Sequence, residues 1–285
     1  MREQHRSLTS DLVATLRAFY SETPADLDVA SDPVASSLLP LPLTTLVLAL
    51  GRPGLSRIAH RALTRATFGL SSGVPLRTAA IDAALRESVA AGTRQLVLLG
   101  AGLDARAYRL PELEGVRVFE LDHPQTQTYK QGRIGALDPL AAEVNFCPID
   151  FERQAIGEVL SGAGFQTELP SLWIWEGVTM YLTPGAIDAT LDAVALYSAV
   201  GSRLCMTYIA PKSGLMQGLG VLLASQIGEP ILGEMTAEEA RGRVERRGFR
   251  VDEDSDAHTW AARFWPAKER RGVRAWERLM VATRA

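Results

Sequence analysis

The fold of this chain is decided by the stretch LVLLGAGLD, residues 96–104. Its four consecutive apolar residues are typical of a strand that is buried on both faces of a parallel sheet. Gly100 and Gly102 then predict a tight turn, which is followed by helix-forming residues. Such a turn brings bare backbone close to a ligand, and the free N–H groups at the start of a helix lie beside it. We interpret the stretch as part of a nucleotide-cofactor site.

The composition is typical of a soluble globular protein with one large α/β domain or two small ones. The 285 residues are 47% hydrophobic and 22% charged. The net charge of −3 gives no global attraction to nucleic acid. The N-terminus has no apolar secretion signal, and the Leu-rich residues 38–50 are too short to span a bilayer. We therefore expect a cytoplasmic protein with neither a nucleic-acid nor a membrane partner.

The two cysteines, Cys147 and Cys205, lie 58 positions apart and form no CxxC pair. Neither has a nearby histidine partner, so we expect no metal site. Both lie in apolar segments, which favours reduced thiols buried in the core.

After residue 75, apolar strands alternate with amphipathic helices. This alternation predicts an α/β fold with a doubly wound, mostly parallel, Rossmann-like sheet of seven strands. The expected strands cover residues 95–100, 116–122, 144–149, 172–175 and 203–209, with edge strands at 249–251 and 279–283. The last of these strands could run antiparallel to its neighbour. The expected helices cover residues 75–91, 124–135, 151–163, 184–199 and 236–247.

The residues before the sheet predict a helical cap rather than an independent domain. Residues 1–22 have an amphipathic helical pattern, 23–42 form an irregular connection, and 44–70 form short helices. One of these carries a basic face that we expect to be solvated, made by Arg57, Arg61 and Arg65. We predict a single domain over 1–285, with a cap at 1–74, a core at 75–285 and a lid insertion near 210–235.

Acidic residues stand at the ends of three successive predicted strands. In a doubly wound sheet, ligands bind at the carboxyl ends of the strands. Acids at several such ends indicate a ligand with several hydrogen-bond donors, such as ribose hydroxyls, an adenine amino group and an ammonium. These acids are Glu120 and Asp122, Asp150, and Glu176.

Two cofactors fit the glycine turn. Gly100-x-Gly102-x-x-Ala105, with Glu120 standing 20 residues beyond Gly100, satisfies the looser dinucleotide pattern of a nicotinamide enzyme. An anionic Asp104 beside a pyrophosphate is unfavourable, however. This favours S-adenosylmethionine, which has no phosphates.

Four motifs in the same order resemble the leucine carboxyl methyltransferase family, which includes bacterial S-adenosylmethionine-dependent O-methyltransferases of polyketide pathways. The resemblance is good over residues 75–210 and fainter outside them. The motifs are LLGAGLDARAYRL at 98–110, FELDHP at 119–124, DF at 150–151 and EGVTMYL at 176–182, preceded by Asp32-Pro33 and by Arg77-Thr78 with Asp82. Ala105 and Phe151 depart from the residues usual in the family, a threonine and a leucine.

The resemblance implies a role for each cofactor-binding residue. Arg77 would hold the methionyl carboxylate, and Gly100 and Gly102 would admit the methionyl backbone. Asp122 would bind the ribose hydroxyls, a choice over Glu120 that the residues alone leave open. Asp150 and Phe151 would contact adenine, and Glu176 would lie near the methionyl ammonium. The product would be S-adenosylhomocysteine.

The methyl acceptor is less defined by the sequence. A carboxylate is already ionised at neutral pH, whereas a phenol benefits from a general base. The chain has four histidines, His5, His60, His123 and His258, and this scarcity favours a carboxylate or an acidic hydroxyl. Tyr181 falls just beyond the fourth strand and is our catalytic candidate, while Trp173 and Trp175 are expected in the core.

The sequence thus predicts O-methylation of a small, polyketide-like acceptor, free or carrier-bound. The alternatives are a non-methylating S-adenosylmethionine-binding protein of the same fold and, less favoured, an NAD-dependent oxidoreductase. Residues 263–284 have a local charge of +5, which we interpret as a solvated helix or as a surface for an anionic partner. The oligomeric state is not specified.

Overall fold

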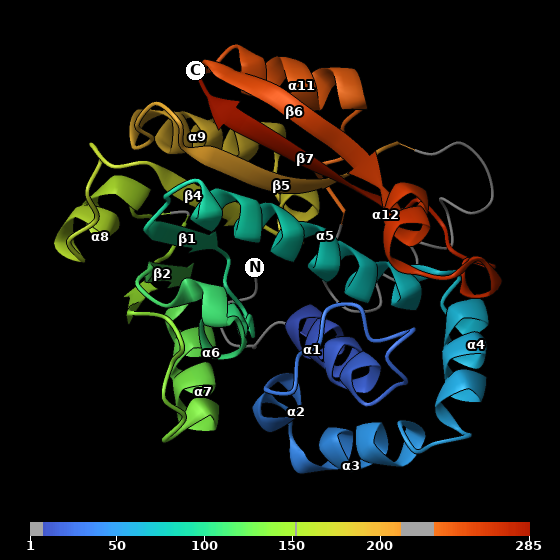
Figure 1. The fold of residues 1–285 in the computed structure, drawn as a ribbon. Coiled ribbons are helices and arrows are strands. Elements are labelled where there is room, and N and C mark those ends of the chain that lie inside the picture. The colour runs from blue at the N-terminus through green and yellow to red at the C-terminus, as the bar shows by residue number, and fades with distance from the viewer. Residues whose placement is uncertain (1–7, 152, 212–230) are drawn as a thin grey trace.

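One seven-stranded sheet forms the centre of the molecule. The computed structural model describes residues 8–151, 153–211 and 231–285. The strand order is β3-β2-β1-β4-β5-β7-β6, with β1 to β5 parallel and β7 antiparallel to both neighbours (Figure 1). The strands are β1 (Gln95–Leu99), β2 (Arg117–Asp122), β3 (Glu143–Pro148), β4 (Ser171–Trp175), β5 (Arg203–Ile209), β6 (Phe249–Asp256) and β7 (Glu277–Arg284). The predicted fold class is confirmed, including the antiparallel last strand.

Helices cover both faces of the sheet, and five of the described α-helices precede its first strand in the chain. The α-helices are α1 (Leu8–Ser21), α2 (Ala35–Leu38), α3 (Leu41–Leu50), α4 (Ser56–Ala66), α5 (Leu70–Ala90), α6 (Arg106–Arg109), α7 (Pro124–Ile134), α8 (Ile156–Gly162), α9 (Pro184–Leu196), α11 (Ala237–Glu245) and α12 (Ala257–Phe264). Short 3₁₀ turns are η1 (Pro111–Leu113), η2 (Thr179–Tyr181) and η3 (Ala267–Glu269). None of the helices in the described ranges is long and apolar enough to cross a membrane.

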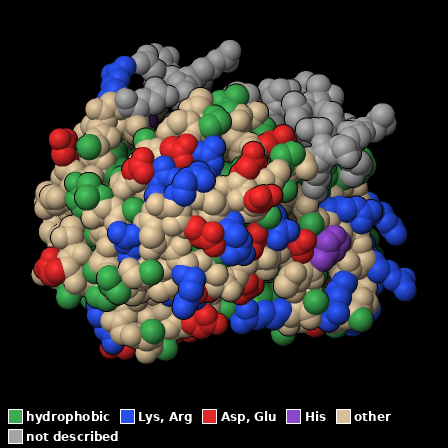
Figure 2. Space-filling model, turned by 90° about the horizontal axis from the view of Figure 1, so that it is seen from above, with side chains coloured by type: hydrophobic (Ala, Val, Ile, Leu, Met, Phe, Trp, Pro, Cys, Tyr) green, Lys and Arg blue, Asp and Glu red, His purple; other side chains and the backbone are tan. Residues whose placement is uncertain are grey.

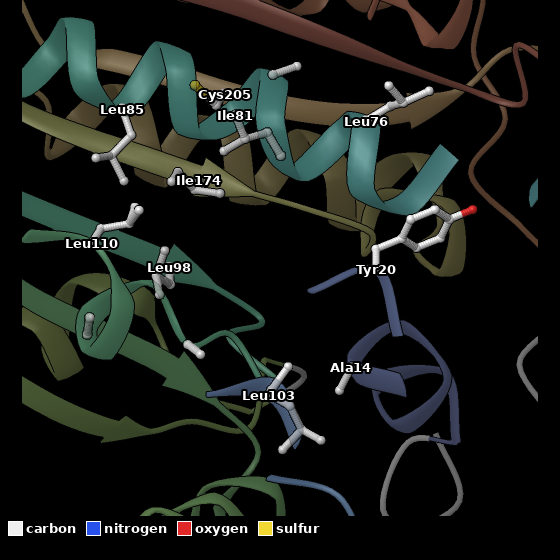
Figure 3. Packing of buried hydrophobic residues seen from close by; sticks show 14 of the residues in the cluster. Ala14, Tyr20, Leu76, Ile81, Leu85, Leu98, Leu103, Leu110, Ile174 and Cys205 are labelled. Carbon is white, nitrogen blue, oxygen red and sulfur yellow. The ribbon is translucent and has the colours of Figure 1, made fainter. Parts of the chain in front are cut away.

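Successive strand residues face opposite layers, because side chains alternate along a strand. On β1, Leu96 and Leu98 pack with α5, α1 and α12, and Val97 and Leu99 pack with α8, α9 and α11. Figure 3 shows Ile81 and Leu85 of α5 above Leu98 and Ile174, with α1 beside them. The α1 helix therefore shares one core with this face of the sheet.

The predicted core residues and several boundaries can be compared directly. Trp173, Trp175, Cys147 and Cys205 are buried, as predicted. The helix expected from 75 begins at Leu70, so its proline lies inside α5 rather than at its start.

Two other segments differ from the sequence prediction. The connection predicted over residues 23–42 contains α2, and α3 begins at Leu41 because a proline is well tolerated in a first helical turn. The helix after the glycine turn, α6, has a single turn, since Leu110 precedes a proline and such residues disfavour helical geometry.

The basic run 263–284 does not form the solvated helix that the sequence analysis predicts. It begins at the end of α12, passes through η3 and ends in β7, whose centre is buried in the sheet. Its arginines have separate local partners: Arg278 binds Asp254 at 3.0 Å, and Arg284 lies over the ring of Phe249. Figure 2 shows basic and acidic side chains interspersed over the middle of the face seen from above, while several basic side chains lie together at its right-hand edge beside a histidine.

A buried polar cluster joins the N-terminal helices to the segment after α12. The Tyr20 hydroxyl and His60 Nδ1 are 2.9 Å apart, and the His60 ring packs edge-on against Trp265. Oε2 of Glu269 lies 3.9 Å from Nε2 of His60, and its Oε1 binds Nη1 of Arg57 at 2.9 Å. Arg57 is therefore paired rather than solvated. Arg61 and Arg65 are exposed, as predicted for a solvated face, although Arg61 also lies 4.0 Å from Glu269, and His60 is a core residue.

We predict that His60 makes folding stability fall on acidification. Burial lowers the pKa of His60, although Glu269 opposes this shift. On acidification the unfolded chain therefore takes up a proton at His60 before the folded chain does. The contribution of neutral His60 to the free energy of unfolding is complete above about pH 6.5 and decreases as the pH falls below it. Urea unfolding from about pH 7 to about pH 5 should show a shallower loss in His60→Asn than in wild type. An equal loss in the two proteins would contradict the prediction; His258→Asn, at an exposed site, is the control.

Candidate cofactor site

The glycine turn lies at the carboxyl edge of the sheet, directly after β1. The N–H groups of Gly100 and Ala101 both donate to the carbonyl of Leu121, at 2.9 and 3.1 Å, which ties the turn to β2. Gly100 has a φ of +70°, and a Cβ there would lie 2.6 Å from Cγ2 of Val178. Both facts require glycine at this position.

Asp122, the last residue of β2, holds its carboxylate at the same edge. Its oxygens accept from the backbone N–H groups of Gly102 at 2.5 Å and His123 at 2.6 Å. Burial raises the pKa of Asp122, and these two hydrogen bonds oppose the rise. A carboxylate oxygen accepts more than one hydrogen bond, so Asp122 keeps acceptor capacity for a ligand.

Glu120 is separated from this edge, although it lies only two residues earlier. It is completely buried, and its carboxylate lies 2.5 Å from Nζ of Lys130 on α7. The sequence alone did not decide which of the two acids faces the ligand edge. In the structure Asp122 lies at this edge, whereas Glu120 belongs to a buried ion pair.

Asp150 and Phe151 follow β3, the next strand outward. The Asp150 side chain is partly buried and lies 3.5 Å from Nε of Arg153, and its N–H donates to Gln154 at 2.9 Å. Phe151 is 42% exposed, so its ring is accessible to a planar ligand. The glycine turn, Asp122 and Asp150 therefore follow β1, β2 and β3 in spatial order.

On the other side of β1, two arginines hold Glu176, which follows β4. Arg77 Nε donates to one carboxylate oxygen and Arg106 Nη1 to the other, each at 2.8 Å. Burial opposes ionisation, but the two guanidinium groups outweigh it and hold the pKa of Glu176 well below its usual range. Arg77 also donates through Nη1 to Glu277 on β7 at 2.5 Å.

Arg106 connects the glycine turn to α5. Its guanidinium lies 2.7 Å from Asp82 and is also paired with Asp104, whose other oxygen accepts the Arg106 backbone N–H at 2.8 Å. The charge of Asp104 is therefore neutralised inside the protein. This weakens our argument that Asp104 would repel a pyrophosphate.

The first helix covers the turn from the other side. Arg17 on α1 donates to the carbonyl of Leu103 at 2.5 Å and lies 3.2 Å from Asp32. Asp32 also faces Arg109, which binds Asp82 at 2.7 Å. The N-terminal helices are thus attached to the turn through buried charges.

Comparison with known proteins gives a consistent family assignment. The family model for leucine carboxyl methyltransferases matches residues 11–195, more than half of the chain. A relative from Mycolicibacterium gilvum, named "Putative S-adenosyl-L-methionine-dependent methyltransferase", is 35% identical over 70% of this chain and 65% of its own length. A relative of the same name from Mycobacteroides abscessus is 36% identical over 69% of this chain and 65% of its own.

The chain belongs to the leucine carboxyl methyltransferase family. The family predicted from the sequence motifs is confirmed. The chain spans just under two thirds of the length of these curated relatives, since 65% of each is covered.

Solved structures agree on the fold of this leucine carboxyl methyltransferase family member. A structure from Thermobifida fusca titled as a "putative methyltransferase" has a TM-score of 0.58 at 17% identity, covering 76% of this chain and 83% of that one. A DUF574 family protein from Streptomyces avermitilis has a TM-score of 0.57 at 16% identity, covering 81% and 91%. At these identities the likeness concerns the fold alone.

The structure brings most of the predicted site residues to one edge of the sheet. Tyr181 ends η2, directly after the Glu176 segment, and is partly buried. Of the lid predicted at 210–235, residues 212–230 lie outside the described residues. Its last part packs on η2, where the N–H groups of Leu232 and Gly233 donate to the carbonyl of Met180 at 2.7 and 3.0 Å.

Sequence reasoning missed two residues of this edge. Arg106 lies inside the family's glycine motif, so the motif itself was the available signal. Glu277 lies beyond the residues that match the family model, and its own segment shows only the apolar pattern of a strand. Its partner Arg77 is 200 positions away, so no local spacing relates the two.

We predict that the Glu120–Lys130 pair is structural. Replacing Lys130 by Met leaves a buried carboxylate without its partner and should lower the free energy of unfolding by about 3–5 kcal/mol. Urea unfolding measures this, and adding Glu120→Gln should restore part of the loss. Lys268→Met, which removes an exposed pair, should change stability by less than about 1 kcal/mol. Equal effects of the two lysine variants would contradict the prediction.

Proposed function

We propose that this protein is an S-adenosylmethionine-dependent O-methyltransferase that acts on a carboxylate or hydroxyl of a small molecule. The observation that carries the proposal is the spatial order of the glycine turn, Asp122 and Asp150 after β1, β2 and β3, with Arg77 beside the turn. This order suits an extended nucleoside ligand that lies across the carboxyl ends of the strands.

Each residue in this row fits a part of the cofactor. Asp122, fixed by two backbone N–H groups, accepts hydrogen bonds from vicinal ribose hydroxyls. Asp150 and the accessible ring of Phe151 suit the amino group and the face of adenine. Gly100 and Gly102 admit the methionyl chain, and the carboxylate of Glu176 suits its ammonium.

Arg77 suits the methionyl carboxylate. Its two ion pairs use Nε and Nη1, and a guanidinium has five N–H donors, so donors remain for a ligand. The group between Arg77 and the adenosine part is a sulfonium, which supplies a methyl already activated for transfer. The protein's own contribution is then to align an acceptor and to exclude water.

The acceptor would lie beyond Glu176, on the side of β5 and β7. Tyr181 on η2 borders that side, and we keep it as the catalytic candidate that positions the acceptor oxygen. The N-terminal helices would enclose a largely apolar acceptor, free or carrier-bound and polyketide-like. This organisation, a cap at 1–74 on a core at 75–285 within one domain, is supported by the core that α1 shares with the sheet.

Calorimetry with S-adenosylmethionine, S-adenosylhomocysteine and NAD tests the proposal. We expect binding of the first two, in line with the names of the relatives, and none of NAD. Binding of NAD alone would support the oxidoreductase alternative. Cofactor binding without methyl transfer to a broad panel of carboxylates and hydroxyls would support the non-methylating alternative.

We further predict that Asp122, and not Glu120, binds the ribose. Asp122→Asn should weaken S-adenosylmethionine binding about 10- to 100-fold, because hydrogen bonds to a charged acceptor are worth about 1.5–3 kcal/mol. The matched control is the double variant Glu120→Gln with Lys130→Met, which removes the buried pair together and should change affinity by less than about threefold. The opposite order of effects, measured by calorimetry, would refute the assignment.

A further inference from the structure

Two basic segments that are distant in the sequence lie side by side on one surface of the molecule. The first is α4, and the second is the stretch 267–274, which connects α12 to β7. Glu269 in the second segment binds Arg57 of α4 at 2.9 Å. Further along, a Cβ on Gly272 would lie 3.0 Å from Cγ2 of Thr64, near the other end of α4. We call α4 and residues 267–274 together the basic surface.

The basic surface concentrates positive charge in a chain whose net charge is −3. Among the described residues, the acids that pair with it are Asp26 and Glu269, so seven basic residues against two acids leave a charge of +5. The seven are Arg57, Arg61, Arg65, Lys268, Arg270, Arg271 and Arg274. The sequence also has no acid between Asp32 and Asp82, a stretch that includes all of α4. Both α4 and α12 lie on the right of Figure 1, and the right-hand edge of Figure 2 carries several basic side chains together.

The outward side of α4 combines these charges with apolar groups. Ile58, Arg61, Ala62 and Arg65 stand at positions i, i+3, i+4 and i+7, so they lie in one row along the helix. All four are exposed, and Ile58 is exposed by 63%. Leu55, which directly precedes α4, is exposed as well. Cations and aliphatic side chains therefore share one accessible row.

The neighbouring helix α3 extends the apolar part of this surface. It leads into α4 through residues 51–55, and the two helices meet at a corner of the molecule (Figure 1). None of its ten residues is charged. Leu41, exposed by 76%, faces outward together with Leu46 and Leu48, whereas Val47 is buried. A helix that is apolar on its outward side fits an apolar partner.

The composition of α3 and α4 distinguishes between the possible partners. A second copy related by a two-fold axis would bring the same cations together. Nucleic acid would neutralise the cations but gives exposed leucines no apolar contact. Protein interfaces are anchored by Tyr, Trp and Phe more than by Leu, and neither helix contains any of the three. An anionic lipid bilayer offers negative headgroups and an apolar layer at the same place.

We propose that the basic surface and the exposed leucines of α3 dock this protein on an anionic lipid bilayer. The guanidinium groups bind headgroup phosphates, for which their geometry is suited. Ile58 and the leucines enter the boundary between the headgroups and the acyl chains. The contact is peripheral and needs no membrane-spanning helix, although the sequence analysis expects no membrane partner. It concerns a surface that includes none of the candidate cofactor residues.

Co-sedimentation of the full chain with lipid vesicles tests the charged part of the surface. Vesicles of phosphatidylcholine and phosphatidylglycerol in equal amounts should bind wild type, and vesicles of phosphatidylcholine alone should not. Arg61→Gln with Arg65→Gln should weaken binding about 25-fold, because each basic residue near an anionic bilayer contributes about fivefold. The matched control is Arg241→Gln with Arg246→Gln, which removes the same charge from exposed positions at α11 and should change binding by less than about threefold.

A second variant tests the apolar part. Ile58→Ser should weaken binding to the anionic vesicles about tenfold, because it removes an aliphatic side chain that would otherwise leave water. Leu196→Ser, at the exposed end of α9, should match wild type. All substituted side chains are exposed, so the variants should keep the fold, and urea unfolding checks this.

Several outcomes overturn the proposal. One is failure of the wild type to bind the anionic vesicles, and another is equal weakening by the arginine pairs of α4 and α11. Unchanged binding of Ile58→Ser also overturns it, because the contact would then be purely electrostatic. Binding of polyglutamate without binding of vesicles would indicate an acidic protein partner instead. Self-association that Ile58→Ser abolishes, measured by light scattering, would make this surface an interface between copies of the chain.

Discussion

The guanidinium of Arg106 is completely buried, and the arrangement of the site depends on how that charge is compensated. Its partners come from three elements: Asp82 from α5, Asp104 from the glycine turn and Glu176 from the end of β4. A buried charge is tolerated only with such partners, and removing one leaves the others uncompensated. The turn, the long helix and the fourth strand are therefore held in one relative position by electrostatics as well as by apolar packing.

The same logic extends outward from Arg106 in both directions. Glu176 is shared with Arg77, which reaches Glu277 on β7, and Asp82 is shared with Arg109, which faces Asp32. Alternating charges thus run from the last strand to the first helices along the edge that carries the candidate site residues. Because most of these groups pair with two or three neighbours, their side chains are oriented by protein contacts alone.

Sequence reasoning succeeded where the information is local. The apolar run before Gly100 and the acids at the ends of β2, β3 and β4 can each be recognised from a few adjacent residues, and the pattern of such segments was sufficient to predict the fold class. Glu120 and Asp122 could not be told apart by spacing, because the difference lies in Lys130, which only the packing of α7 on β2 brings to Glu120. Arg106 and Glu176 are 70 positions apart, and Arg77 and Glu277 are 200 apart. Such pairs follow from the sheet order, which no window of sequence contains.

The place of β7 in the sheet affects how the molecule is assembled at the ribosome. β7 follows β6 in the chain but lies between β5 and β6, so β6 has no partner strand until residues 277–284 have emerged. Until then β5 presents a free edge of unpaired N–H and C=O groups, which is a template for aggregation. Arg77 and Glu176 also meet before their third partner exists. A nascent chain that stalls after β6 would therefore hold an incomplete sheet with an unpaired edge, and the docking of β7 covers that edge and brings Glu277 to Arg77 in the same event.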